Sequence, residues 1–103
     1  MKRKLRVAII CGGKSVEHEI SLQSAKNVIE AIDKDGYDVV LIGIDKEGRW
    51  HLQNLADFEE EMKSSALPHI TSQGDEVAFI PAGAGQLINV TTGEKLQKVD
   101  VVF

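Results

Sequence analysis

Two short apolar runs, joined by a glycine pair and an amphipathic stretch, occupy the first 45 residues. The run from Leu5 to Cys11 is rich in β-branched residues, which predicts a buried strand that Gly12–Gly13 ends. A second run of the same type covers residues 38–44, after a break at Asp35–Gly36. Between the runs, apolar residues recur three or four positions apart, as in an amphipathic helix: Ile20, Leu22, Ala25, Val28, Ile29 and Ile32. A strand–helix–strand unit of this length places its two strands parallel in one sheet.

The remainder of the chain is less regular but adds strands to this unit. We expect a short strand over 49–52, a weak acidic helix over 55–65 and a strand over 76–80. Residues 86–98, with Thr92–Gly93 at the turn, predict a hairpin, and residues 99–103 predict another buried strand. The fold class is therefore α/β: an open, mainly parallel sheet with helices on both faces and a small hairpin insertion. The region 55–85 shows no clear topology.

The chain of 103 residues is long enough for one domain. It stops at Val-Val-Phe103, inside a strand of the buried type, whereas chain termini are normally polar and exposed. We therefore expect residues 1–103 to be a single domain that is truncated at its C-terminal strand and continues in a longer protein. The alternative is a small natural domain that ends on an edge strand.

Composition and charge exclude several classes of protein. Sixteen acidic and twelve basic residues give a net charge of −4, and the basic cluster at residues 2–4 is short, which argues against nucleic-acid binding. Apolar runs stay well below the roughly 18 residues that a membrane span needs. The single cysteine, Cys11, permits no internal disulfide and favours a reducing, cytoplasmic compartment. A nucleophilic role for Cys11 is conceivable, but a small buried residue is the preferred interpretation.

The junction between the first strand and the helix is the richest candidate for a site. Gly12 and Gly13 allow the backbone to turn sharply and a ligand to approach closely. The helix that follows presents unpaired N–H groups, and ligands of open α/β sheets collect at the carboxyl ends of the strands. A tight connection without any ligand is the alternative, and the glycines alone give it equal weight.

Two nucleotide-binding patterns fail at the same junction. Residues 8–15 fit a relaxed phosphate-loop pattern, but Ala8–Ile10 belong to the strand, so too few residues remain to wrap a phosphate. The dinucleotide-binding fingerprint also fails, because Gly12 and Gly13 are adjacent and the third, spaced glycine is missing.

Glu17, His18 and Glu19 place two carboxylates and an imidazole at the predicted helix start. Such a group can bind an ammonium group or a metal ion, although Glu17 and Glu19, two positions apart, cannot share one helix face. The alternative is a favourable interaction of the acids with the helix dipole, worth about 0.3–1 kcal/mol. We predict no metal site, because His51 and His69 lie far off in sequence and no paired-ligand spacing appears. The acidic run over 57–61 predicts a solvated helix face, and Trp50 a packing residue.

Residues 12–25, Gly-Gly-Lys-Ser-Val-Glu-His-Glu-Ile-Ser-Leu-Gln-Ser-Ala, resemble the N-terminal signature of the D-alanine–D-alanine ligases. That signature reads Gly-Gly-x-Ser-x-Glu-x-Glu-x-Ser-Leu-x-Ser, and every fixed position is met. Support comes from Tyr37–Asp45 with the following Gly48-Arg-Trp50, and from the closing Val99–Phe103. The resemblance spans most of the chain and weakens between residues 55 and 85.

The resemblance implies a Rossmann-like α/β domain of the type that precedes an ATP-grasp module. It also implies a ligase that joins two D-alanines in the cytoplasm for peptidoglycan synthesis. Glu17 matches the first glutamate of the signature, which in this family binds the ammonium group of the first D-alanine. It is therefore the implied catalytic and substrate-binding residue. Ser15 and Val16 are implied to line the same turn, and Gly12 and Gly13 to support it.

Other positions of the signature receive smaller roles. Ser21 and Ser24 are expected to serve the helix start. Glu19 matches the second glutamate and is expected to be structural. Lys14 and His18 occupy variable positions, so no function is transferred to them.

The resemblance also implies cofactors and partners. ATP and Mg²⁺ (or Mn²⁺) act in the full-length ligase, bound by residues beyond 103, and none is expected on this chain alone. The implied partners are D-alanine, the remainder of the ligase chain and a second copy in a homodimer. The chain alone is predicted to be inactive, because Glu17 orients a substrate but supplies no phosphoryl-transfer electrostatics. The alternative is a free-standing module of the same fold that binds a small ligand or dimerises without catalysis.

Overall fold

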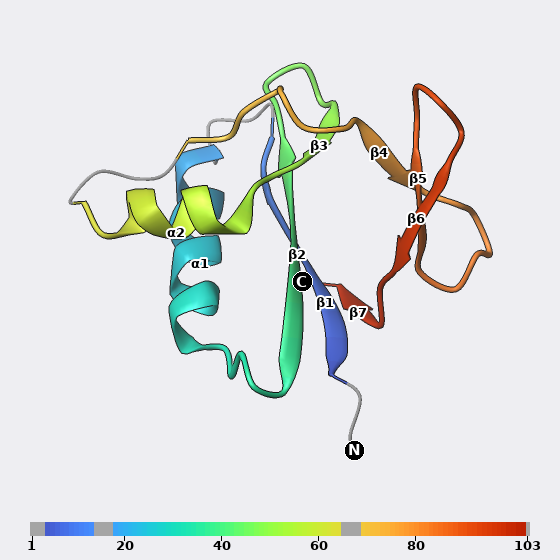
Figure 1. Ribbon diagram of the computed structural model, residues 1–103. Coiled ribbons are helices and arrows are strands. Elements are labelled where there is room, and N and C mark those ends of the chain that lie inside the picture. The colour runs from blue at the N-terminus through green and yellow to red at the C-terminus, as the bar shows by residue number, and fades with distance from the viewer. Residues whose placement is uncertain (1–3, 14–17, 65–68, 103) are drawn as a thin grey trace.

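A mainly parallel sheet forms the centre of the computed structural model, which describes residues 4–13, 18–64 and 69–102. Within these ranges the strand order is β3-β2-β1-β7, with β1 spanning Leu5–Gly12, β2 Tyr37–Ile44, β3 Trp50–Leu52 and β7 Val101–Val102. β1 runs parallel to both β2 and β7, and β3 is antiparallel to β2 (Figure 1). This arrangement confirms the α/β class and the open, mainly parallel sheet.

Two helices cover one face of this sheet. α1 spans His18–Ala31, and α2 spans Leu55–Met62, where the side chain of Asn54 accepts a hydrogen bond from the N–H of Asp57 and caps the helix. The two helices lie on the same side of β1 and β2 (Figure 1). They share a core with alternate residues of the strands, because successive side chains of a strand point to opposite faces: Val7, Ile9, Cys11, Leu22, Ala25, Ile29, Leu41 and Phe58.

The amphipathic pattern of α1 is confirmed except at its start. Leu22, Ala25 and Ile29 are buried, whereas the side chain of Ile20 is 66% exposed. Ile20 lies in the first turn, where the sheet does not cover it.

A small antiparallel sheet packs against the opposite face. It contains β4 (Val77–Phe79), β5 (Gln86–Asn89) and β6 (Lys95–Lys98) in the order β4-β5-β6. The hairpin over 86–98 is confirmed, and β4 joins it, a pairing that the sequence left open. The second core lies between the two sheets: Ala8, Val40, Ile42, Val77, Leu87 and Val99.

The expectation of helices on both faces needs a correction. Among the described residues, α1 and α2 share one face, and the small sheet covers the other (Figure 1). The physical reason is that Val77 and Leu87 present an apolar face of their own, which buries Ala8 and Ile42 as a helix would.

The strand expected over 99–103 is present as β7, which is the last strand in the order formed by the described residues. Val101 and Val102 are 39% and 51% exposed, whereas Val99, which precedes the strand, is buried.

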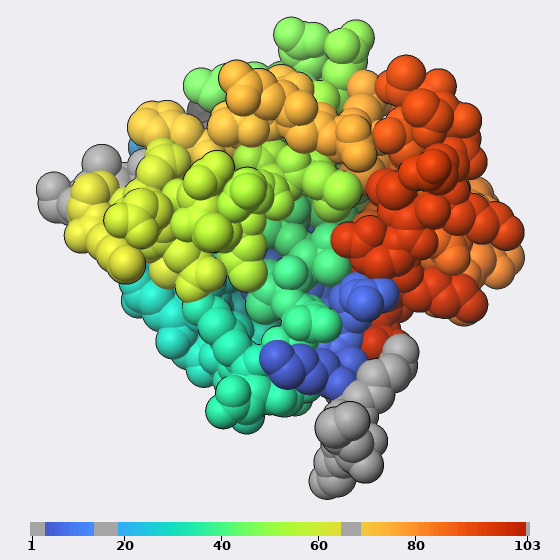
Figure 2. Space-filling view, viewed as in Figure 1, coloured from blue at the N-terminus to red at the C-terminus, as the bar shows by residue number. Residues whose placement is uncertain are grey.

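The space-filling view shows how the rest of the surface is arranged. The segment from residue 69 to β4 runs across the top of the molecule, between α2 and the small sheet (Figure 2). It lies tightly on β3: a Cβ atom at Gly74 would overlap the carbonyl oxygen of Leu52. In the described part of the chain, no helix has the length and apolar character needed to cross a membrane.

Candidate functional site

The glycine pair lies at the carboxyl end of β1, as the sequence predicts. Gly12 and Gly13 have φ values of 95° and 121°, which L side chains rarely adopt. Among the described residues, no atom lies within 4 Å of a Cβ atom built on Gly13. The backbone conformation, and not crowding by the described residues, therefore favours glycine at this position.

Two hydrogen bonds fix the turn to its neighbours. The N–H of Gly13 donates to the carbonyl oxygen of Ile44, the last residue of β2, at 2.9 Å. The N–H of Gly12 donates to Oγ of Ser21, in the first turn of α1, at 3.0 Å. Ser21, expected to serve the helix start, instead attaches α1 to the end of β1 through this bond.

The predicted substrate-binding residues Ser15, Val16 and Glu17 lie outside the described residues, as does Lys14. In sequence they occupy the link between Gly13 and the start of α1 at His18. Their role in a site stays a prediction. The structure brings together the two ends of that link, at the carboxyl edge of the parallel strands, where ligands of open α/β sheets bind.

Glu19 and Ser24 lie on exposed positions of α1. Glu19 is in the first turn of the helix, where a carboxylate interacts favourably with the dipole. This placement agrees with the structural role expected for it.

Asp45 forms a second polar centre at the same edge of the sheet, directly after β2. Its Oδ1 accepts hydrogen bonds from the backbone N–H groups of Glu47 and Arg49, each at 2.9 Å. Its Oδ2 lies 3.1 Å from Nε2 of His51. The N–H of Arg49 contributes most to lowering the pKa of the Asp45 carboxyl group, desolvation opposes it, and the bonds from His51 and the Glu47 N–H lower it further.

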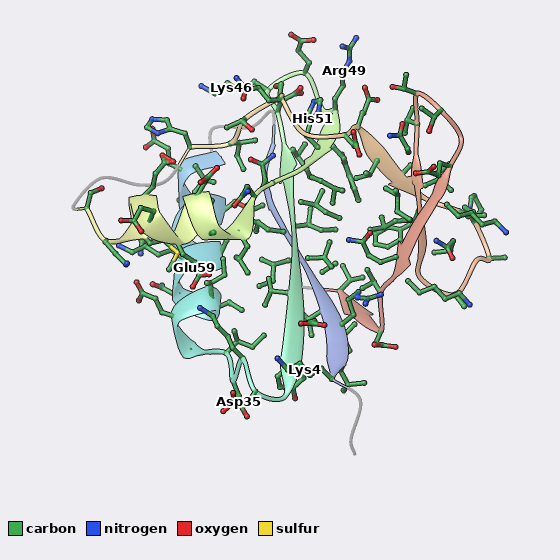
Figure 3. The ribbon with its side chains drawn as sticks, viewed as in Figure 1. Lys4, Asp35, Lys46, Arg49, His51 and Glu59 are labelled. Carbon is green, nitrogen blue, oxygen red and sulfur yellow. The ribbon has the colours of Figure 1, made fainter. Side chains whose placement is uncertain are left out.

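The imidazole of His51 is buried, with 7% of the residue exposed. Its Nδ1 lies 3.4 Å from the carbonyl oxygen of Gly74, so both ring nitrogens face oxygen atoms. Figure 3 shows His51 beneath the β2–β3 turn, with Arg49 extending away from the molecule.

Sequence reasoning missed the pairing of Asp45 with His51. The spacing Asp45-x-x-Gly48 does indicate a turn in which an aspartate caps backbone N–H groups. The contact of the other carboxylate oxygen of Asp45 with His51 requires β3 to fold back beside β2. No local sequence pattern predicts that contact.

Cys11 is the buried residue that its sequence context predicts. Its side chain packs in the helix-covered core, and Sγ donates to the carbonyl oxygen of Ile42 at 3.8 Å. Burial raises the pKa of the thiol to about 11. A thiol in this environment is a poor nucleophile at neutral pH.

The acidic run of α2 is the solvated helix face that was predicted. Glu59 contacts Lys34, Glu60 pairs with Lys63 at 3.3 Å, and Glu61 pairs with His69 at 3.2 Å. Trp50 packs edge-on against Phe79, with ring centroids 6.2 Å apart, so its packing role is confirmed. Within residues 4–13, 18–64 and 69–102, no three histidine, cysteine, aspartate or glutamate side chains form a group that would hold a metal ion.

Known proteins resemble this chain over nearly its whole length. The sequence model of the family described as "D-ala D-ala ligase N-terminus" matches residues 6–103. The D-alanine--D-alanine ligase of Shouchella clausii is 50% identical over 101 residues, which are 97% of this chain and 27% of that protein. D-alanine--D-alanine ligase A of Escherichia coli is 46% identical over 101 residues, 97% of this chain and 28% of the ligase.

Solved structures agree with the sequence comparisons. The VanG D-Ala:D-Ser ligase of Enterococcus faecalis superposes with a TM-score of 0.72 and 27% identity, over 98% of this chain and 28% of that one. The D-alanine-D-alanine ligase of Coxiella burnetii superposes with a TM-score of 0.66 and 28% identity, over 97% and 28%. The chain thus spans between a quarter and a third of the length of these relatives.

Proposed function

This chain belongs to the D-ala D-ala ligase N-terminus family, and we propose that it is the first-D-alanine-binding part of an ATP-dependent D-alanine–D-alanine ligase. The observation that carries the proposal is the family match over residues 6–103, together with identities of 50% and 46% to curated ligases. The glycine turn at Gly12–Gly13, on the carboxyl edge of the sheet, supports it.

Glu17 holds the ammonium group of the first D-alanine in this proposal. A carboxylate fixed beside the substrate provides a charge-assisted hydrogen bond and orients the carboxylate of that substrate for activation. Ser15 and Val16 line the same link, and Gly12 and Gly13 fix where it begins. The support for these roles is the signature over residues 12–25 and the anchored position of Gly13 beside Ile44.

ATP and Mg²⁺ (or Mn²⁺) belong to the rest of the ligase. ATP, when bound there, supplies the phosphoryl group that activates the carboxylate of the first D-alanine for attack by the amine of the second. Phosphoryl transfer requires metal ions and cationic side chains around the phosphates. The described ranges of this chain contain no group of three candidate metal ligands. The proposal assigns to this chain the binding and orientation of the first D-alanine.

The proposal extends to the setting of the enzyme. The dipeptide product serves peptidoglycan synthesis, the ligase acts in the cytoplasm, and it functions as a homodimer. Membership of the family supports the role in peptidoglycan synthesis. The single buried cysteine agrees with a reducing compartment such as the cytoplasm. Sedimentation equilibrium of the full-length ligase would test the homodimer.

The test of the proposed function is the substitution Glu17→Gln in the full-length ligase. It keeps the size of the side chain and removes the charge that pairs with the ammonium group. We expect the KM for the first D-alanine to rise about tenfold or more, as for the loss of a charge-assisted hydrogen bond. The matched control is Glu19→Gln, which neutralises an exposed carboxylate two positions away.

Three outcomes decide the proposal. Near-normal kinetics for Glu17→Gln would remove Glu17 from the site. An equal effect of Glu19→Gln would show that general charge near the helix start matters, not a substrate contact. A wild-type protein that forms no D-alanyl-D-alanine would favour the alternative of a small-ligand-binding or dimerisation module without catalysis.

A further inference from the structure

Asp45 organises the backbone between β2 and β3. Its carboxylate accepts hydrogen bonds from two backbone N–H groups, as described above. Its own N–H donates to the carbonyl oxygen of Arg49 at 2.9 Å. Its carbonyl oxygen accepts from the N–H of Gly48 at 3.0 Å. The conformation of the turn over 45–49 therefore depends on this one residue.

His51 connects that turn to a second segment. One ring nitrogen contacts the Asp45 carboxylate, and the other faces the carbonyl oxygen of Gly74. The next residue, Leu52, donates its N–H to the carbonyl oxygen of Asp75 at 2.9 Å. Because the ring is buried and has oxygen atoms on both sides, it holds the turn in one position relative to the crossing segment.

The residue before Asp45 links this assembly to the glycine turn. Ile44 is paired in register with Gly12 of β1 on one side and with Trp50 of β3 on the other. Its carbonyl oxygen accepts the hydrogen bond from the N–H of Gly13. That carbonyl group and the N–H of Asp45 belong to one planar peptide unit, so a rotation at Asp45 changes the direction in which the Ile44 oxygen points.

We propose that the Asp45–His51 pair positions the Gly12–Gly13 turn, which the proposed substrate-binding residues follow in sequence, by fixing the Ile44–Asp45 peptide. Asp45 and His51 are positioning residues in this view, since they act on the substrate through the backbone and not by contact. The inference rests on the proposed function for its effect on D-alanine, but the coupling between Asp45 and Gly13 stands on the geometry.

A similar turn at the opposite end of β2 provides a control. Oδ1 of Asp33 accepts a hydrogen bond from the N–H of Asp35 at 2.9 Å, in the turn that leads into β2. This aspartate also caps a turn beside β2, but before its first residue, Tyr37, whereas Gly13 bonds to its last residue, Ile44. Asp33→Ala therefore removes a comparable cap without touching the glycine turn.

The experiment compares Asp45→Ala, His51→Phe and Asp33→Ala in the full-length protein. His51→Phe keeps a ring of similar bulk and removes both polar contacts. Hydrogen exchange of the Gly13 amide measures the coupling directly, without any reference to activity. Initial rates measured at low D-alanine concentrations give the KM for the first D-alanine, and rates at saturation give kcat.

We expect Asp45→Ala and His51→Phe to speed exchange at Gly13 and to raise the KM for the first D-alanine, each about tenfold, as for the loss of one hydrogen bond. The value of kcat should change less than about threefold, because the phosphoryl-transfer machinery lies elsewhere. Asp33→Ala should leave both measurements within about twofold of wild type.

The other results distinguish a failure of this inference from a failure of the proposed function. Unchanged exchange at Gly13 in both variants would show that the coupling is absent. Faster exchange with an unchanged KM would show that the turn does not position the substrate. A fall in kcat alone, shared with Asp33→Ala, would indicate a merely structural role. Normal coupling in a protein that never uses D-alanine would instead show that the proposed function has failed.

Discussion

The amide N–H of Gly13 and the carbonyl oxygen of Ile44 are joined by a hydrogen bond of 2.9 Å. This bond continues the pairing of β1 with β2 by one residue beyond the register that ends at Gly12 and Ile44. It directs the chain out of the sheet at the edge where the candidate site lies. The glycine turn therefore begins as an extension of the sheet.

Replacing Gly13 by alanine is expected to destabilise the protein through the backbone alone. A φ of 121° is unfavourable for an L side chain, and no atom of the described residues lies within 4 Å of the added Cβ. We expect a loss of about 1–2 kcal/mol in the free energy of unfolding, measured by urea denaturation.

Gly36→Ala is the matched control for that substitution. Gly36 does not have a left-handed φ, and a Cβ there would lie 3.4 Å from Oδ2 of Asp33, an ordinary contact. Its effect on the free energy of unfolding should stay within about 0.5 kcal/mol. Equal losses in the two variants would contradict the assignment of the cost to backbone strain at Gly13.

Asp45 is expected to make the folded state acid-sensitive. Its pKa is lower in the folded chain than the ordinary value of 3.8, so the unfolded chain binds the proton first as the pH falls. The stabilising contribution of Asp45 is therefore complete well above pH 3.8 and is lost as the pH falls through the lowered pKa of the folded state.

Urea unfolding of wild type and Asp45→Asn between about pH 3 and 6 would measure this contribution. The stability difference between the two proteins should be largest at the upper end of that range and should shrink on acidification. A difference that is independent of pH would show that the carboxylate charge at position 45 does not contribute.

Cys11 should resist alkylation while the protein is folded. Burial raises the pKa of its thiol from 9.0 to about 11, which lowers the thiolate fraction at pH 8 by about a hundredfold. The rate of reaction with iodoacetamide, followed by intact mass, should fall at least that much relative to the same chain in urea. Comparable rates in the two states would mean that Cys11 is accessible and would reopen its role as a nucleophile.

The contact between the two sheets is expected to depend strongly on Leu87. This residue of β5 is fully buried in the core that faces Ala8 and Ile42. Leu87→Ala should lower the free energy of unfolding by about 2–5 kcal/mol, because it leaves a cavity in that core. Val90→Ala is the control, since Val90 follows the same strand and is 47% exposed. A small effect of Leu87→Ala would mean that the small sheet folds without contributing to the central one.

Much of the fold and part of the site follow from local patterns. The apolar runs at Leu5–Cys11 and 38–44, with a helical period between them, are sufficient to predict two parallel strands joined by a helix. The glycine turn, the hairpin over 86–98 and the burial of Cys11 are predictable for the same reason. In each case residue types and their spacing within one segment are enough for the prediction, even where the contacts themselves join distant segments.

Tertiary structure decided the features that depend on which distant surfaces meet. The apolar face that covers Ala8 and Ile42 comes from β4 and β5, which begin 35 positions or more after Ile42, and no local period distinguishes that solution from a helix. The exposure of Val101 and Val102 follows from the place of β7 at the edge of the sheet.

The same division separates the two halves of the site. The sequence by itself determined the glycine turn and the family signature that follows it, because backbone conformation and turn chemistry are properties of adjacent residues. Only the tertiary structure decided that His51 meets Asp45 and that Ile44 receives the N–H of Gly13. Those contacts require β1, β2 and β3 to align in register, which depends on the packing of both cores and not on any one segment.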